Sequence, residues 1–226
     1  MFPRARSEYG ARIDVMTCGD FFAGLIGTQQ CPATLKEWLR TPEENFAMSV
    51  NGEVFIDGPG MFTQTREALL GYYPEDVRRK RIAAQLMSLA QTGQYNHERV
   101  ARRGDVVTLR AVISRFTDSA IALAFLLNRI FKPYYKWAFR ALSELPLAGA
   151  ETACLLQKIA EIGDFDDESL ARRQLRIEDL CAVFRRELQN QDLSDSDEPF
   201  LAKHGEIVQN SISDEFLRGL PAQYIV

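Results

Sequence analysis

The chain contains almost no histidine. His97 and His204 are the only two among 226 residues, and neither has a cysteine or a second histidine close to it in the sequence. Structural zinc sites and Ser-His-Asp triads need these side chains in recognisable combinations. The sequence therefore argues against a zinc site and against catalysis by a histidine-activated nucleophile.

Cysteine is also scarce. The four cysteines, Cys18, Cys31, Cys154 and Cys181, form no Cys-x-x-Cys pair and no zinc-type spacing. Isolated cysteines of this kind are typical of reduced, mostly buried thiols in a cytosolic protein. We therefore expect a cytoplasmic protein without a disulfide framework.

Long hydrophobic runs are missing. The most apolar run, residues 120–127, is eight residues long, whereas a helix needs about 20 apolar residues to span a bilayer. The first ten residues are polar and charged, unlike a signal peptide. We expect no contact with a membrane.

Common phosphate-binding and catalytic motifs are absent as well. The chain has no G-x-S-x-G, no G-x-G-x-x-G and no G-x-x-x-x-G-K-[ST] sequence. The segment Gly58-Pro59-Gly60 is typical of a turn, because no strand, loop and helix pattern of the kind that forms a phosphate loop surrounds it.

Positive charge is concentrated in the middle of an acidic chain. The whole sequence has 27 basic and 31 acidic residues, a net charge of -4, which argues against a general nucleic-acid binder. Residues 78–140 nevertheless contain 13 basic residues and only three acidic ones. This distribution favours a focused site for an anion. The alternative is that these cations pair with the acidic remainder of the chain.

One segment combines cations with aromatic side chains. Residues 126–140 have the sequence LLNRIFKPYYKWAFR, in which two lysines and two arginines lie among tyrosines, phenylalanines and a tryptophan. Such a segment could bind an anion that carries a flat ring. The alternative is that the aromatic residues belong to the core and the cations form a solvated rim whose aliphatic stems cover it.

Helix signals dominate the chain. We expect helices at 20–27, 35–40, from 42 onward, 74–92, from 105 to a stop at Pro133, 134–143, 151–162, 169–189 and 213–218, with Asp20 and Asp105 as N-caps and Gly27 as a stop. Short strands are expected at 11–17 and 53–57. The predicted fold is mainly α, a helical bundle with a small β element near the N-terminus. Its core should include Phe116, Leu123, Leu127 and Trp137.

Four consecutive cations, at positions 78–81, lie within the expected helix 74–92. At about 100° per residue they cover most of the helix circumference, so at least one faces the interior or a groove. A buried unpaired arginine is costly. That residue therefore needs a bound anion, backbone carbonyls or a carboxylate, and an acid from residues 1–77 is the first alternative to a ligand.

Several short motifs indicate a family. In chain order they are Asp20-Phe21-Phe22 with Leu25-Ile26-Gly27, Glu37-Trp38-Leu39, residues 52–57 (GEVFID), Phe62 with Arg66, residues 73–77 (YPEDV), Arg102-Arg103-Gly104-Asp105 and Tyr134-Tyr135-Lys136-Trp137. From about residue 12 to residue 145 the chain resembles the bacterial DUF4037 family of uncharacterised domains, which normally follows a nucleotidyltransferase-fold domain. It is more distantly similar to the helical part of aminoglycoside nucleotidyltransferases. The resemblance implies residues 1–60 as an α/β remnant of such a core and 61–226 as the helical domain.

The chain departs from that pattern where the chemistry would lie. A nucleotidyltransferase core carries a Gly-Ser turn and a pair of aspartates that hold magnesium. The chain has no Gly-Ser dipeptide, and its two Asp-x-Asp sets, at 164–166 and 195–197, lie in acidic linkers. Asp14 could take the place of a third carboxylate, with an ordinary surface aspartate as the alternative. We name no catalytic residue and no metal ligand.

The resemblance therefore implies a nucleotide- or substrate-binding helical module of a nucleotidyltransferase-like protein, inactive alone, so its status as an enzyme stays open. The implied anion-binding residues are Lys136, Trp137, Lys132, Arg102, Arg103 and Tyr134, supported by Asp105, Asn128 and Arg81. The chain itself requires no cofactor, and Mg-ATP or another nucleotide would act only together with a catalytic core. A partner would be a nucleotide, a phosphorylated small molecule, a nucleotidyltransferase core or another protein. The alternative function is a non-catalytic regulatory or protein-interaction scaffold.

Overall fold

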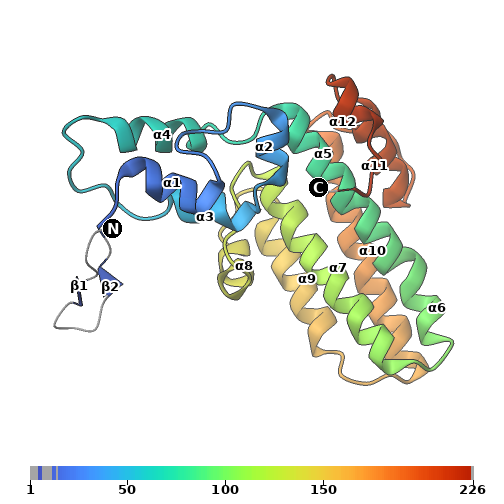
Figure 1. Cartoon of the computed structure of the whole chain (residues 1–226). Coiled ribbons are helices and arrows are strands. Elements are labelled where there is room, and N and C mark those ends of the chain that lie inside the picture. The colour runs from blue at the N-terminus through green and yellow to red at the C-terminus, as the bar shows by residue number, and fades with distance from the viewer. Residues whose placement is uncertain (1–4, 7–11, 14, 225–226) are drawn as a thin grey trace. The chain divides into compact units, whose positions relative to one another are not determined.

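The computed structural model describes residues 5–6, 12–13 and 15–224, and this part of the chain is mainly helical (Figure 1). The chain divides by its internal contacts into two compact units, unit 1 (Met1–Tyr72) and unit 2 (Tyr73–Val226). The predicted boundary at residue 60 was defined by the resemblance to a nucleotidyltransferase core, so it stays a prediction. Among the described residues, no helix combines the length and the apolar character needed to cross a membrane.

Unit 1 consists of short helices. They are α1 (Cys18–Ile26), α2 (Leu35–Arg40), α3 (Glu43–Val50) and α4 (Met61–Leu70). Helix α3 packs against α1 and α4, and the ring of Phe22 on α1 lies 5.0 Å from that of Phe62 on α4. The buried Trp38 stacks on Phe46 at 4.8 Å. Aromatic packing thus supplies much of the core of this small unit.

Local capping chemistry explains where these helices begin and end. Thr34 and Glu37 form a reciprocal capping box at the start of α2, and Gly27 ends α1 with a positive φ of 78°. The predicted cap Asp20 is wrong, because Thr17 caps α1 by accepting a hydrogen bond from the Asp20 N–H at 3.0 Å.

The predicted β element is not supported. Ala5–Arg6 (β1) and Arg12–Ile13 (β2) pair in antiparallel fashion over two residues each, which is too short to form a layer of the fold. Residues 51–57 contain no strand, so the prediction for 53–57 is wrong. The segment has apolar side chains, but no other element packs on them: Phe55 and Ile56 are 86% and 92% exposed. A strand is specified where one of its faces is buried, and here neither face is.

Unit 2 is a helical bundle. Its elements are α5 (Glu75–Leu89), the π-helical segment η1 (Ala90–Asn96), α6 (His97–Ala101), α7 (Val106–Leu127), α8 (Tyr135–Leu142), α9 (Gly149–Glu161), α10 (Asp167–Asn190), α11 (Leu201–Asn210) and α12 (Glu215–Gly219). Helix α5 packs on α7 and α11, and α9 packs on α10. The long helices α5, α7, α9 and α10 run alongside one another in Figure 1.

The centre of the bundle is the apolar half of α7. Phe116, Leu123 and Leu127 are fully or almost fully buried there, as the periodicity predicts. Trp137 is 60% exposed on α8, so its predicted place in the same core is wrong. Helix α8 is amphipathic: it buries Ala138 and Leu142 and turns its larger aromatic side chains to solvent.

Candidate functional site

The structure divides the predicted anion site into two groups. Arg102 and Arg103 lie just before α7, whereas Lys132 and Lys136 lie beyond its other end. A helix of 22 residues is about 33 Å long. The two groups therefore do not converge on one ligand. The helix expected from residue 105 onward already separates them, and grouping the cations by charge alone overlooked it.

At the N-terminal end of α7, two of the predicted residues have local partners. Arg102 forms an ion pair with Glu98 at 2.5 Å, with both side chains well exposed. Asp105 caps α7, as predicted, by accepting a hydrogen bond from the Thr108 N–H at 3.0 Å. The Thr108 hydroxyl also donates to this carboxylate, and these hydrogen bonds hold the pKa of Asp105 below its ordinary value. Arg103 is exposed.

At the other end of α7, Asn128 holds a loop in place. Its Nδ2 donates to the carbonyls of Ala124 at 2.8 Å and Leu147 at 3.0 Å, and its Oδ1 accepts from the Leu147 N–H at 2.9 Å. The helix ends at this cap and not at Pro133 as predicted, because Arg129 takes a positive φ of 54°. Arg81, the third supporting residue, is buried with its guanidinium 4.9 Å from the Tyr73 ring centre.

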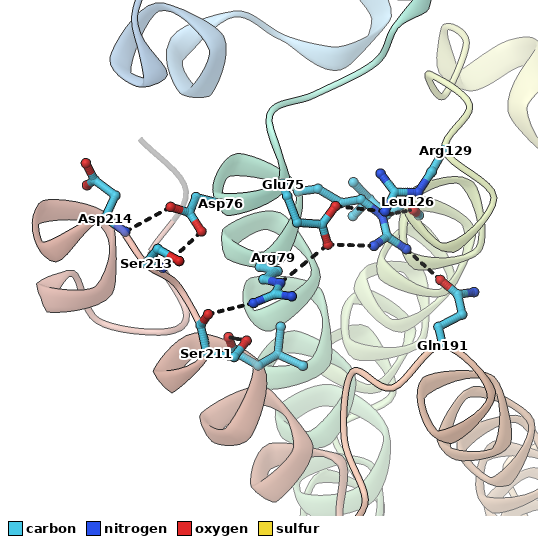
Figure 2. Close-up of polar contacts among 11 residues, drawn as sticks. Glu75, Asp76, Arg79, Leu126, Arg129, Gln191, Ser211, Ser213 and Asp214 are labelled. Carbon is cyan, nitrogen blue, oxygen red and sulfur yellow. Dashed lines mark hydrogen bonds and ion pairs between the residues drawn. The ribbon is translucent and has the colours of Figure 1, made fainter.

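Two cations of α5, Arg78 and Arg79, find their partners within the protein itself. Arg78 is almost fully buried and donates to the Leu126 carbonyl at 2.9 Å, to Glu75 at 3.1 Å and to Gln191 Oε1 at 2.6 Å. Figure 2 shows Arg129 and Arg79 directed at the same Glu75 carboxylate, at 2.8 Å and 3.4 Å. This arrangement matches the alternative in which the buried cation pairs with an acid from residues 1–77.

Glu75 is the anionic centre of this network, which we call the Glu75 network. Partial burial acts to raise the pKa of Glu75, but the charges and hydrogen bonds of Arg78 and Arg129 outweigh it and hold that pKa below its ordinary value. From the sequence, Glu75 is only one member of the motif at 73–77 and of the helix expected at 74–92. No sequence signal showed that it would gather arginines separated from it by as many as 54 residues.

The remaining predicted residues form an exposed surface on and before α8. We call residues 132–140 the α8 surface. Tyr134, Tyr135, Trp137 and Phe139 are all exposed large aromatic residues, and Tyr135 and Trp137 are 67% and 60% exposed. The rings of Tyr134 and Tyr135 lie 4.5 Å apart. The predicted Lys132, Tyr134, Lys136 and Trp137 are close to one another in the sequence, on α8 and just before it, and their role as a site stays a prediction.

The cations of the α8 surface are available to a ligand. Lys136 and Arg140 are exposed and Lys132 is half-buried. Within the described residues none of the three forms an ion pair. The site prediction omitted Tyr135, Phe139 and Arg140, although the i, i+4 spacing of the pairs 135/139 and 136/140 would have indicated a shared helix face.

Nothing in the described part of the chain gathers three or more His, Cys, Asp or Glu side chains in a metal-binding arrangement. The two Asp-x-Asp sets serve local structure: Asp166 caps α10 through Ser169, and Asp197 accepts a hydrogen bond from Gln189. Asp14 lies outside the described residues, so its suggested role stays a prediction.

Comparison with known families gives one family-level finding. Residues 38–138 match the model of a domain of unknown function, DUF4037. The matched region begins in α2 and ends within α8, so it includes the Glu75 network up to Arg129 and most of the α8 surface. No curated protein and no solved structure matches the chain. Over these residues the chain is therefore similar to the DUF4037 family, in agreement with the resemblance carried by its sequence motifs.

Proposed function

We propose that unit 2 is a helical binding module whose α8 surface takes a nucleotide or another ring-bearing phosphate, and that the chain performs no nucleotidyl transfer by itself. One observation carries the proposal. Tyr135 and Trp137, each more than half exposed, flank Lys136 in a segment, residues 128–140, that contains four cations and no acidic residue.

Exposure of these side chains has a physical cost. Each square ångström of apolar surface that becomes buried stabilises the fold by roughly 25 cal/mol. Trp137 and its two neighbouring tyrosines, which stay exposed to water, therefore contribute less to the free energy of folding than they would in the core. Exposed aromatic clusters of this kind mark interaction surfaces. Aromatic faces stack on bases, and lysine and arginine bind phosphate oxygens, so this combination is complementary to a nucleotide.

The Glu75 network fixes the segment that leads into the α8 surface. Arg129 at the end of α7 is held by Glu75, and Phe131 packs edge-on against Tyr73 with ring centres 5.0 Å apart. The segment that leads into α8 is therefore anchored at two points. A surface on an anchored segment loses less conformational entropy when it binds a ligand.

Catalysis would require groups from outside this surface. Transfer of a nucleotidyl group needs clustered carboxylates that hold magnesium against the phosphates, and Asp166 and Asp197 are engaged in local hydrogen bonds. Association with a bacterial nucleotidyltransferase core, use of Mg-ATP and a cytoplasmic location form part of the same proposal. The four cysteines are free thiols, which fits a reducing compartment.

Tryptophan fluorescence tests the binding proposal directly. The chain has two tryptophans, and only Trp137 is exposed, because Trp38 is buried. We expect ATP to quench Trp137, and Lys136→Ala to weaken binding by about 1–3 kcal/mol, the size of a charge-assisted hydrogen bond. Lys158→Ala is the matched control, since Lys158 is an exposed lysine on α9.

The result that would overturn the proposal is equally specific. If ATP and inorganic polyphosphate leave the fluorescence unchanged, with and without magnesium, the α8 surface is not a nucleotide site. The alternative function, a protein-interaction scaffold, is favoured by the separation of the predicted cations into two groups. It predicts that Trp137→Ala disrupts a complex with a partner protein in size-exclusion chromatography, while ATP has no effect on that complex.

A further inference from the structure

A small cavity lies in unit 2, far along the bundle from the α8 surface. It has a volume of about 180 Å³, and its lining comes from α7, α9, α10 and the linker at 162–166. Its only charged lining residues are Arg110 on α7 and Arg173 on α10; the others are apolar or glycine. Ligand pockets for drug-sized molecules are roughly 300–1,000 Å³, so this cavity suits something smaller than a nucleotide.

Arg173 is only 1% exposed and is incompletely satisfied. Its Nη2 donates to the carbonyls of Ile162 at 2.5 Å and Asp164 at 3.1 Å. Its Nε and Nη1 have no hydrogen-bond partner among the described residues. Burial lowers the pKa of Arg173, and the Asp166 charge only partly opposes this effect. A buried guanidinium with unused donors is costly unless an anion completes it.

Arg110 brings a second positive charge to the same place. Its guanidinium carbon lies 5.1 Å from the Phe165 ring centre, and that of Arg173 lies 5.2 Å from the same ring. In the described part of the chain neither arginine forms an ion pair. Each guanidinium is thus in cation–π contact with the same ring, and both positive charges line the one cavity.

The acidic linker does not supply that anion. Asp164 and Asp167 are exposed, and the Asp166 carboxylate accepts hydrogen bonds from the Ser169 N–H and hydroxyl, both at 2.9 Å. Asp166, the carboxylate whose charge acts on Arg173, is thus used to cap α10. Phe165 lies half-buried in the non-helical linker beside these residues.

We propose that this cavity binds a small tetrahedral oxyanion, phosphate or sulfate, held between Arg110 and Arg173. Arginine donates several N–H groups in a planar array that matches such oxygens. The inference is independent of the nucleotide proposal, because it concerns a different end of the bundle and a smaller ligand.

The experiment is thermal melting in inorganic phosphate or sulfate compared with chloride at equal ionic strength. A ligand stabilises the state that it binds, so the melting temperature of the wild-type chain should rise with phosphate in a saturable way. Arg110→Gln should weaken the apparent phosphate affinity about tenfold or more. Arg115→Gln is the matched control, because Arg115 is an exposed arginine on the same helix that does not line the cavity.

Two more variants test whether the phosphate response arises in this cavity. In Lys136→Ala the contribution of the α8 surface to any phosphate response is weakened, so the saturable response that remains reports on the cavity. Arg173→Met removes the buried charge and should abolish the response; if this variant fails to fold, Arg110→Gln still decides the question. Oxyanions also stabilise proteins by exclusion from their surface. An equal, non-saturating phosphate shift in the wild type, Arg110→Gln and Arg115→Gln would therefore overturn the proposal.

Discussion

At the scale of single residues, two buried cations of α5 have different kinds of hydrogen-bond partner. Arg78 meets a carboxylate in the Glu75 network, whereas Lys80 is 0% exposed and meets only neutral acceptors. The Lys80 Nζ donates to Gln209 Oε1 at 3.0 Å and to the carbonyls of Pro221 at 2.6 Å and Ala222 at 3.2 Å. Burial without a counter-charge lowers the pKa of Lys80 from 10.5 to about 8.

This pKa predicts a rise in stability at alkaline pH. Below pH 8 Lys80 is protonated in both states, and the native state bears the cost of burying the charge. Between about pH 8 and 10.5 the unfolded chain binds more protons than the native one, so the free energy of unfolding should increase with pH, by up to about 3 kcal/mol. Urea unfolding of the wild type and of Lys80→Met, compared across that range, isolates the effect. A wild-type curve parallel to that of Lys80→Met would contradict it.

Leu123 provides the second prediction at this scale. Its side chain is fully buried in the apolar half of α7, so Leu123→Ala should lower the free energy of unfolding by roughly 2–5 kcal/mol through lost burial and a cavity. Val107→Ala on the same helix is the control, because Val107 is 81% exposed and should change stability by about 0.5 kcal/mol or less. Equal losses in the free energy of unfolding for the two variants would contradict the burial of Leu123 and the exposure of Val107 on α7.

At the scale of elements, the π-helical segment η1 is the unusual feature. Gly93 lies in it, facing α7 and α10: a Cβ built on Gly93 would be 2.5 Å from Phe116 and 2.8 Å from Ile177. The absence of a side chain therefore permits the close approach of three elements. π-Helical turns are rare and occur frequently at functional sites, but here packing explains the glycine.

Gly93→Ala should therefore destabilise the chain although alanine favours helices. Overpacking typically costs about 1–3 kcal/mol, which exceeds the gain of about 1 kcal/mol from helix propensity. Gly24→Ala in α1 is the matched control, because no atom lies within 4 Å of its added Cβ and the propensity gain should appear alone. Chemical denaturation of the two variants should give changes of opposite sign.

At the scale of the whole molecule, the C-terminal segment is part of the bundle. Asp76 at the start of α5 accepts hydrogen bonds from the N–H groups of Ser213 at 3.0 Å and Asp214 at 2.8 Å (Figure 2). Arg79 donates to the Ser211 carbonyl at 2.6 Å. Together with Lys80, these contacts hold the last described residues against α5, the helix that also packs on α7.

Because these contacts lie within unit 2, residues 73–226 should fold without unit 1. We expect this fragment to be monodisperse, to give a far-UV circular dichroism spectrum dominated by helix and to melt cooperatively. Removing residues 211–226 from the same fragment should abolish the cooperative transition, because Asp76 loses the N–H groups of Ser213 and Asp214 and the buried Lys80 keeps only Gln209. A fragment that stays unfolded with its C-terminus intact would show that the two units form one cooperative structure.

Much of the helical pattern could be predicted because it depends on local chemistry. The helix at 35–40 and the Asp105 cap are confirmed, since a capping side chain and its N–H partners lie within three residues of each other. The strand at 53–57 and the core position of Trp137 are wrong. Both depend on whether distant residues offer a partner strand or a buried face, and alternation or aromatic character alone does not determine that.

In the candidate site, too, the features that depend on local sequence could be predicted, and those that depend on distant residues could not. The sequence by itself determined that cations and aromatic residues are interspersed at 132–140. Within α8 the pairs 135/139 and 136/140 each share a helix face, because residues four apart are neighbours on a helix surface. The helix expected from residue 105 onward also separates Arg102 and Arg103 from Lys136. Only the tertiary structure decided that Glu75 neutralises arginines from α5 and the end of α7, and that Arg110 and Arg173 lie beside one ring. These arrangements arise from packing between helices far apart in sequence, where the cost of burying a charge selects the partner.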